Sequence, residues 1–335
     1  MTSMWGWIGF NAVVLTLIAI DLLVFHRRPR HVSLKEAAAW SALWVGLSLT
    51  FSLFVFRFMG TNSGLEFLAG YLIEYALSVD NIFVFVLIFG YFRIPMEYQH
   101  RVLLWGIMGA LILRGAMIAA GSVLVSRFEW ILYIFGAFLV FTGARMALQK
   151  ADAIYDPEDN PILRLVRKVI PVTQEYHGQK FFVRAPDEAG VVRLMATPLF
   201  IVLILVETTD VIFATDSIPA IFAVTRDPFI VYTSNVCAVL GLRALYFLLA
   251  GIVDKFHYLK MGLSVVLIFI GLKMLGESFV HIPIGISLGV VAMILAVSVF
   301  ASLKWPRHDP PSIPPLATLG QHRDKPSESR NHTED

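Results

Sequence analysis

Long apolar segments alternate with short polar ones along most of the chain. The apolar segments lie at 5–25, 39–58, 65–90, 101–125, 129–148, 194–224, 229–253, 261–279 and 283–303. Each is long enough to cross about 30 Å of hydrocarbon, which takes about 20 helical residues. No positive residue precedes the first segment and no small-residue cleavage site follows it, so we interpret it as a helix and not as a signal peptide. The pattern predicts an all-α polytopic membrane protein with nine transmembrane helices.

The composition agrees with this prediction and excludes several kinds of site. Hydrophobic residues make up 57% of the 335 residues and charged residues 16%, whereas soluble domains carry about 25% charged residues. The single cysteine, Cys237, excludes a disulfide framework and a thiolate metal site. No spanning segment contains a closely spaced histidine pair, so we expect no zinc or copper site built on imidazole.

Positive charge predicts the orientation. With the N-terminus outside, 20 of the 27 Lys and Arg residues fall on the cytoplasmic side and three on the other. Cytoplasmic loops of membrane proteins carry such an excess. We therefore expect an external N-terminus and a cytoplasmic C-terminus, with residues 1–303 forming the transmembrane domain.

Two polar stretches lie outside the spans. Residues 149–193 mix charged residues with Pro, Gly and a short apolar patch, which predicts a cytoplasmic loop with a small helix or hairpin of its own. Residues 304–335 are rich in Pro and polar residues, and we expect a disordered cytoplasmic tail.

The two halves of the chain resemble each other weakly. RGAMIAAGSVLVSRF at 114–128 resembles RALYFLLAGIVDKF at 243–256, and FTGARMAL at 141–148 resembles FIGLKMLG at 269–276. These matches predict two three-helix repeats, 65–148 and 194–279, with 5–25, 39–58 and 283–303 as peripheral helices. A unit with an odd number of helices must insert upside down when repeated, and inverted repeats are a transporter architecture.

Acidic residues lie inside the apolar segments. Five of them fall in EYALSVDNIF at 74–83 and in ETTDVIFATDSIPAIFAV at 207–224: Glu74, Asp80, Glu207, Asp210 and Asp216. A carboxylate at the centre of a spanning helix costs about 2.5–3.5 kcal/mol on insertion scales. These acids must therefore be protonated, paired with bases or neutralised by a cation.

The charge count leaves an acidic excess. Asp21 is a sixth intramembrane acid, and the spanning segments contain four bases, namely Arg114, Arg145, Arg243 and Lys273. We interpret Arg114, Arg243 and Asp21 as charge-balancing residues. Two uncompensated negative charges would suit one divalent cation, and protonation of two carboxylates would balance them equally well.

Helical geometry affects how these acids can meet. Glu207 and Asp210 share a face, whereas residues six apart, such as Glu74 and Asp80, are turned about 120° from each other. Local helix breaks would let them converge, and the candidates are Ser78, Asn81, Ser217 and Pro219. The resulting oxygen cage would suit Mn²⁺, Mg²⁺ or Ca²⁺. Whether Asp80 corresponds to Asp210 or to Asp216 stays open in the sequence.

Three stretches resemble the TerC family, and within it the Alx branch. They are GYLIEYALSVDNIFVF at 70–85, LVETTDVIFATDSIPAIFAVTRDPFIV at 205–231 and NVCAVLGLRALYFLLAG at 235–251. The resemblance implies a lysine-exporter-like fold in the bacterial inner membrane, linked with tellurite resistance and manganese export. The metal-handling residues that it implies are Glu74, Asp80, Asn81, Glu207, Asp210, Asp216 and Ser217. Tyr75 is a departure, since many relatives carry lysine or serine there.

These observations favour a secondary transporter over an enzyme. We expect efflux of a divalent cation, foremost Mn²⁺, in exchange for protons, with a role in metal and pH homeostasis and an indirect link to tellurite, because the acidic core does not suit an oxyanion. We expect no tightly bound cofactor and no nucleic-acid partner; a homo-oligomer or a membrane partner is compatible with the sequence. The alternative is a membrane scaffold or accessory subunit that supports metal loading of exported proteins. An intramembrane hydrolase is disfavoured because no glycine-flanked aspartate pair is present.

Overall fold

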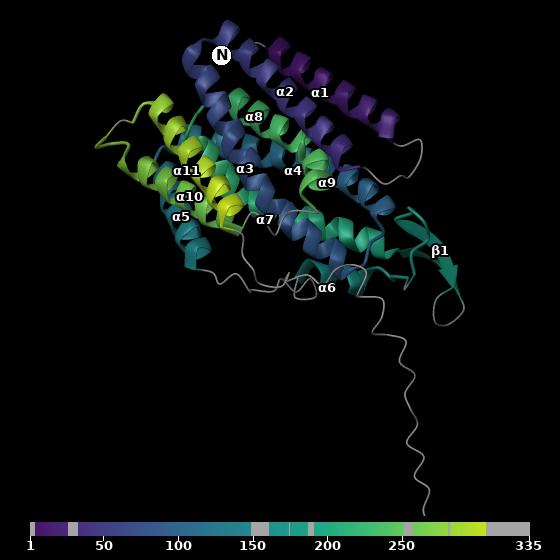
Figure 1. Cartoon of the computed structure of the whole chain (residues 1–335). Coiled ribbons are helices and arrows are strands. Elements are labelled where there is room, and N and C mark those ends of the chain that lie inside the picture. Colours follow the sequence, from purple (N-terminus) through teal and green to yellow (C-terminus); the bar gives the residue numbers. More distant parts are fainter. Residues whose placement is uncertain are drawn as a thin grey trace, which may run out of the picture.

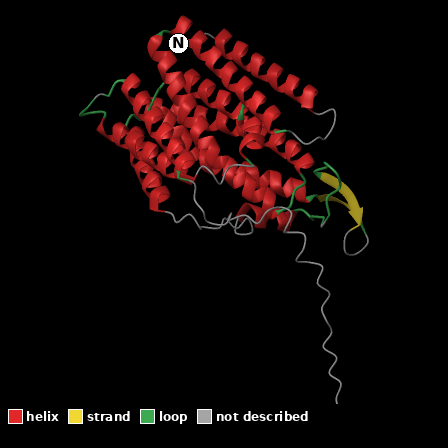
Figure 2. Cartoon of the chain, in the orientation of Figure 1, coloured by secondary structure: helices red, strands yellow, loops and turns green. Residues whose placement is uncertain are grey.

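The computed structural model describes residues 4–25, 33–148, 161–173, 175–186, 191–250, 257–280 and 282–305. These residues are nearly all helical (Figure 1, Figure 2). The elements are α1 (Met4–Phe25), α2 (Leu34–Met59), α3 (Thr61–Tyr91), α4 (Met96–Arg127), α5 (Ile131–Leu148), α6 (Pro161–Val169), β1 (Phe182–Pro186), β2 (Val192–Ala196), α7 (Pro198–Phe222), α8 (Pro228–Leu240), α9 (Leu242–Leu249), α10 (His257–Gly276) and α11 (Ile284–Lys304). The predicted tail lies outside the described residues except for its first two, Lys304 and Trp305.

The polytopic fold predicted from the sequence is confirmed. Among the described residues, eight helices are long and apolar enough to cross a membrane, and the number becomes nine if α8 and α9 form one span bent by 40°. Local signals set several helix starts. The Ser33 side chain caps α2 by accepting a hydrogen bond from the Glu36 N–H, and Asp227 caps α8 in the same way just before Pro228.

The predicted breaks beside Asp80 and Asp216 are wrong. The α3 helix runs without interruption through Ser78 and Asn81, and α7 continues past Pro219 to Phe222. Pro219 lies in the last turn of α7, where the helix is packed against α3 and α4 and loses only one backbone hydrogen bond. The bend occurs instead between α8 and α9, at Gly241.

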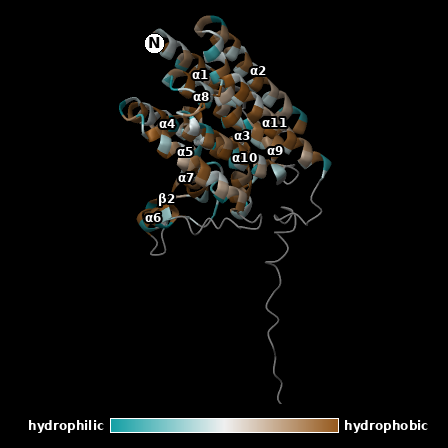
Figure 3. Ribbon diagram, turned by 90° about the vertical axis from the view of Figure 1, so that its left-hand side faces the viewer, coloured by the Kyte–Doolittle hydropathy of each residue, from teal (hydrophilic) through white to brown (hydrophobic). Residues whose placement is uncertain are grey.

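The α3 and α7 helices pack against each other in the middle of the bundle, with α4 and α8 beside them (Figure 1). The α1 and α2 helices lie on one side, and α5, α10 and α11 lie on the other. Hydrophobic residues recur along all the long helices (Figure 3), and many of those that point outward are more than half exposed, such as Leu53, Ile112 and Met293. Exposed apolar side chains on spanning helices are what a lipid environment requires.

The α5 and α10 helices approach each other unusually closely. A Cβ atom built on Gly271 would lie 2.6 Å from the backbone oxygen of Gly136, and one on Gly143 would lie 2.8 Å from that of Ser264. Small residues at such crossings let helix backbones come together in membranes. Gly143 and Gly271 occupy the same position in the repeated FTGARMAL and FIGLKMLG motifs. The contacts are therefore reciprocal, as a two-fold relation would make them, and the inverted repeat itself stays a prediction.

The segment between α5 and α7 contains both a helix and a hairpin, where the sequence predicts one or the other. The α6 helix packs against α7, and β1 and β2 pair antiparallel with Phe182 opposite Ala196 and Pro186 opposite Val192. The hairpin reaches Ala196, so the span predicted at 194–224 begins only at Pro198. The hairpin is also the one departure from an all-α fold within the described part of the chain.

Candidate functional site

Two buried acids of the doubled motif share one arginine, and we call this group the first centre. Arg114 of α4 donates to Asp210 of α7 through Nε to Oδ2 at 2.9 Å and through Nη2 to Oδ1 at 2.8 Å. Its Nη1 contacts the Glu74 carboxylate of α3 and lies 3.4 Å from Oδ1 of Asn235 in α8. All three charged side chains are at most 4% exposed. The flat guanidinium fork can serve two carboxylates at once, and Arg114 is thus the counter-ion of both.

A third acid, Glu207, adjoins this centre. It lies one helical turn before Asp210 and within its electrostatic range. Its carboxylate rests directly against Gly109 of α4, where any Cβ atom would collide with it. Glu207 Oε2 is buried and has no hydrogen-bond partner. With Glu207 included, the first centre contains three carboxylates and one guanidinium, a formal excess of two negative charges.

Asp80 of α3 and Asp216 of α7 belong to a second centre. The two carboxylates lie within electrostatic range of each other. Asp216 also faces Thr142 and Arg145 of α5, and Asp80 lies within electrostatic range of Lys260 of α10. Two acids therefore meet two bases, and the second centre is formally neutral.

Uninterrupted helices explain why there are two centres. Six residues along a helix turn a side chain by about 120°, so Glu74 and Asp80 of α3 face different neighbours, as do Asp210 and Asp216 of α7. The structure thus groups Glu74 with Asp210 and Asp80 with Asp216 in space, and which aspartate corresponds to Asp80 in the predicted repeat stays open. The five acids among the seven predicted metal-handling residues are divided between two places and do not form one cage. Their role as ligands stays a prediction, and the described residues contain no group of three or more His, Cys, Asp or Glu side chains arranged to hold a metal ion.

Several buried polar atoms around these centres have no hydrogen-bond partner. On α3 and α7 they are Glu74 Oε2, Ser78 Oγ, Asn81 Oδ1, Glu207 Oε2 and Ser217 Oγ. Buried polar groups are normally paired, and an orphaned one costs about 1–3 kcal/mol. Asn81 and Ser217 follow Asp80 and Asp216 directly and are each 1% exposed. Each of these atoms is an oxygen, and the carboxylate and amide oxygens lack a donor or a cation, whereas the two hydroxyls can also donate. The Nδ2 of Asn235, a donor beside the first centre, is likewise unpaired.

Sequence reasoning missed four residues of the two centres. Gly109 and Asn235 adjoin the first centre, and Thr142 and Lys260 adjoin the second. Asn235 begins NVCAVLGLRALYFLLAG, so the sequence singled out its segment but not its side chain. The sequence gives no signal that the other three belong to a site, because the role of a small or singly charged residue in a helix depends on which side chain of a neighbouring helix it contacts.

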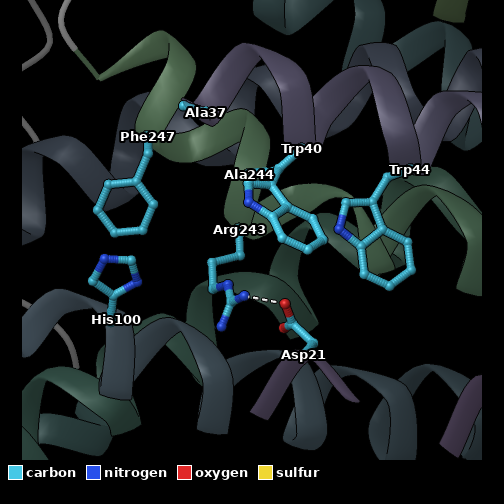
Figure 4. A pocket seen from close by; sticks show the side chains of 8 residues that line it. All are labelled: Asp21, Ala37, Trp40, Trp44, His100, Arg243, Ala244 and Phe247. Atoms are coloured by element: carbon cyan, nitrogen blue, oxygen red, sulfur yellow. Dashed lines mark hydrogen bonds and ion pairs between the residues drawn. The ribbon is translucent and has the colours of Figure 1, made fainter. Parts of the chain in front are cut away.

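Arg243 pairs with an acid outside the doubled motif. It forms an ion pair with Asp21 of α1, and both line a small pocket with Trp40 and Trp44 of α2 (Figure 4). On the other side of this pocket, the His100 ring of α4 stacks on Phe247 of α9 with centroids 4.1 Å apart. The pair ties the first helix to the bent α8–α9 segment, apart from the two acidic centres.

The fold and the centres define a polytopic membrane protein with an acidic core at the packing of two long helices. Its sequence matches the profile of the integral membrane protein TerC family over residues 59–309. The chain therefore belongs to the TerC family.

Close relatives cover most of the chain. An "Uncharacterized membrane protein STKORF319" from Myxococcus xanthus is 53% identical over 91% of this chain and 94% of its own length. A "Putative membrane-bound redox modulator Alx" from Escherichia coli (strain K12) is 52% identical over 91% and 96%. The protein of the same name from Salmonella typhi is 51% identical over 91% and 95%. No solved structure matches the chain significantly.

Proposed function

We propose that this protein is a secondary transporter that exports a divalent cation, foremost Mn²⁺, across the bacterial inner membrane in exchange for protons. The observation that carries the proposal is the charge of the first centre, where Arg114 pairs with Glu74 and Asp210. The third acid, Glu207, adjoins Asp210 without a base of its own among the described residues. Uncompensated charge in a membrane core is costly and is characteristic of ion and proton pathways. One divalent cation or two protons would each neutralise it.

The oxygen atoms available as metal ligands support binding of a hard cation. Glu74 Oε2 and Glu207 Oε2 both lack a protein donor, and the neutral oxygens of Ser78, Asn81 and Ser217 lie on the same two helices. Carboxylate, amide and hydroxyl oxygens suit Mn²⁺, Mg²⁺ and Ca²⁺. The only cysteine, Cys237, is buried elsewhere in the bundle, so a soft thiolate site does not compete with this interpretation.

The exchange would follow from competition for the same carboxylates. A cation reaching Glu74 and Glu207 from the cytoplasm would displace their protons, and protons arriving from outside would release the cation. Arg114 would hold Asp210 in place and keep part of the negative charge compensated in both states. The centre would then be neutral whether it carries the cation or two protons, which favours its movement between inward-open and outward-open forms.

The name of the Escherichia coli relative refers to redox modulation. This chain contains one cysteine, so an internal dithiol–disulfide exchange is not available to it. Control of a redox-active metal such as manganese would influence redox balance without a thiol. The proposed transport is compatible with that name in this way.

Flux into proteoliposomes tests the proposal. Purified protein is exposed to a panel of divalent ions across an imposed pH gradient, and Mn²⁺ flux is expected to depend on the gradient. Glu207→Gln and Asp216→Asn are expected to abolish flux while the proteins keep their helicity. Glu129→Gln is the control, because this carboxylate is 85% exposed and lies outside both centres. Undiminished flux in folded Glu207→Gln and Asp216→Asn protein would refute the proposal.

A further inference from the structure

The α6 helix and the hairpin are held firmly against one end of the bundle. Leu163 of α6 is fully buried in the same hydrophobic cluster as Leu199 and Val202 of α7. In the segment that joins α6 to the hairpin, the Tyr176 hydroxyl donates to the backbone oxygen of Phe92 at 2.5 Å. Gln179 Nε2 donates to the backbone oxygen of Glu97 at 3.3 Å. This region is therefore fixed beside the turn between α3 and α4.

The apolar face of α6 is only half covered. Leu163 packs toward α7, but Ile162, Leu165 and Val169 are 42%, 61% and 71% exposed. Their spacing of three and four residues places them in one stripe along the helix, beside the buried one. Arg164 and Lys168 follow on the polar side, and both are exposed. An amphipathic helix of this kind, with an apolar stripe that is partly exposed, is typical of a helix that lies in a membrane interface.

The hairpin presents a second exposed apolar row. Phe182, Val192 and Leu194 are 42%, 64% and 62% exposed, and the strand register places them on one face. Arg184 lies directly opposite Leu194 on that face. The row therefore combines apolar side chains with a positive charge.

Aromatic contacts place the hairpin beside the spanning helices. The Phe182 ring lies 4.5 Å from that of Phe200 in α7. The preceding Phe181 meets Trp105 of α4 edge-on at 6.4 Å and has the Arg101 guanidinium 5.1 Å from its ring. Tryptophan and arginine gather where spanning helices enter the headgroup layer. The base of the hairpin therefore contacts aromatic and basic side chains of the kind that occur at membrane surfaces.

We propose that α6 and the β1–β2 hairpin form a membrane-surface cuff that binds anionic phospholipid headgroups. Charge complementarity selects this occupant: the described residues between 161 and 196 include six Lys or Arg and one acid, Glu175, while the acids at 152–159 and 187–188 lie outside the described residues. Basic clusters beside a membrane attract anionic lipids. The stripe of Ile162, Leu165 and Val169 enters the acyl boundary, and Arg164, Lys168 and Arg184 contact the headgroups. This inference does not depend on the proposed transport.

A fluorescent label tests the depth of α6. Cys237 is buried, so a cysteine introduced by Leu165→Cys can be labelled selectively with an environment-sensitive nitrobenzoxadiazole probe. In nanodiscs that contain one-third phosphatidylglycerol, we expect blue-shifted emission and quenching by spin-labelled lipid. The same probe attached through Glu175→Cys, an exposed position outside the stripe, is expected to show the emission of a probe in water and no quenching by spin-labelled lipid. Water-like emission from position 165 would overturn the proposal.

Bound lipid tests the charge. Native mass spectrometry of protein released from mixed phosphatidylcholine and phosphatidylglycerol bilayers is expected to show several-fold enrichment of phosphatidylglycerol. The double substitution Arg164→Gln and Lys168→Gln should remove most of that enrichment. Arg57→Gln with Arg127→Gln is the matched control, since it removes two exposed bases at the far ends of α2 and α4. Equal enrichment in both double variants, or a stoichiometric protein partner shielding the position 165 probe in place of lipid, would contradict the cuff.

Discussion

Because Gly109 has no side chain, it leaves room for the charged carboxylate of Glu207. The Glu207 carboxylate occupies the space that a Cβ atom on Gly109 would fill. Glutamate is long and flexible, so it can move away when that space is taken, and the helices around it need not separate. Gly109 therefore controls where the charge of Glu207 lies more than it controls stability.

We expect Gly109→Ala to lower Mn²⁺ flux at least about tenfold while the melting temperature changes by only a few degrees, because a displaced carboxylate leaves the packing intact. Flux in proteoliposomes and thermal unfolding in detergent measure the two effects. Gly115→Ala on the same helix is the control, since its Cβ would lie 3.6 Å from Tyr232, an ordinary contact. Equal flux in the two variants would show that Gly109 does not position Glu207.

Arg114 has a structural role that is separate from transport. Replacing it with leucine leaves Glu74 and Asp210 buried without their counter-ion, and breaking a buried pair in this way costs about 3–5 kcal/mol. Denaturant unfolding in mixed micelles should register that loss.

The control for Arg114→Leu is Arg226→Gln. Arg226 pairs with Glu129 at 3.6 Å where both side chains are more than half exposed, and such pairs contribute less than about 1 kcal/mol. A similar loss in both variants would mean that the buried pair does not stabilise the bundle. Adding Glu74→Gln and Asp210→Asn to Arg114→Leu should restore part of the stability, because the unpaired charges are then removed.

At the scale of helices, the sequence predicts the spans well because length and hydropathy decide them locally. The boundaries agree with the structure to within a few residues for most spans. The helices α2 and α4 begin earlier than predicted, at Leu34 and Met96, and α7 begins later, at Pro198, because strand β2 takes apolar residues that are extended. The composition of residues 149–193 also indicated local structure there.

Helix continuity could not be predicted in the same way. Pro219 and the polar residues beside Asp80 would weaken an isolated helix. In the bundle, α3 packs against α7 and α8, and α7 packs against α3 and α4, and this packing keeps both helices continuous. That continuity, in turn, divides the acids between two centres. The identity of the candidate acids was visible in the sequence, and their grouping was not, because it depends on the neighbours that each helix face meets.

The crossing of α5 and α10 makes a further prediction at this scale. A methyl group on Gly271 would press against the backbone oxygen of Gly136, which cannot move aside as a side chain can. We expect Gly271→Ala to destabilise the bundle by about 1–3 kcal/mol, as overpacking does, with a matching fall in melting temperature. Gly289→Ala in α11 meets nothing within 4 Å and should be neutral. Unchanged stability for Gly271→Ala would show that the crossing tolerates expansion.

At the scale of the whole molecule, the charge distribution predicts the electrical character of transport. The first centre has a formal excess of two negative charges and the second has none, so exchange of one divalent cation for two protons would move no net charge. We expect Mn²⁺ flux driven by a pH gradient to be unchanged when a potassium diffusion potential of either sign is imposed with valinomycin. A flux that rises or falls with that potential would indicate another stoichiometry.

The contacts of Arg114 and Arg243 also bear on how the chain enters the membrane during synthesis. Glu74 and Arg114 lie on consecutive spans, so this ion pair can form as soon as α3 and α4 have been made. The α7 helix, with three acids, is made later, when Arg114 is already in place to receive Asp210. The ion pair of Asp21 and Arg243 joins residues that are 222 apart along the chain. This link between the first helix and α9 can therefore form only after most of the spanning helices have been made.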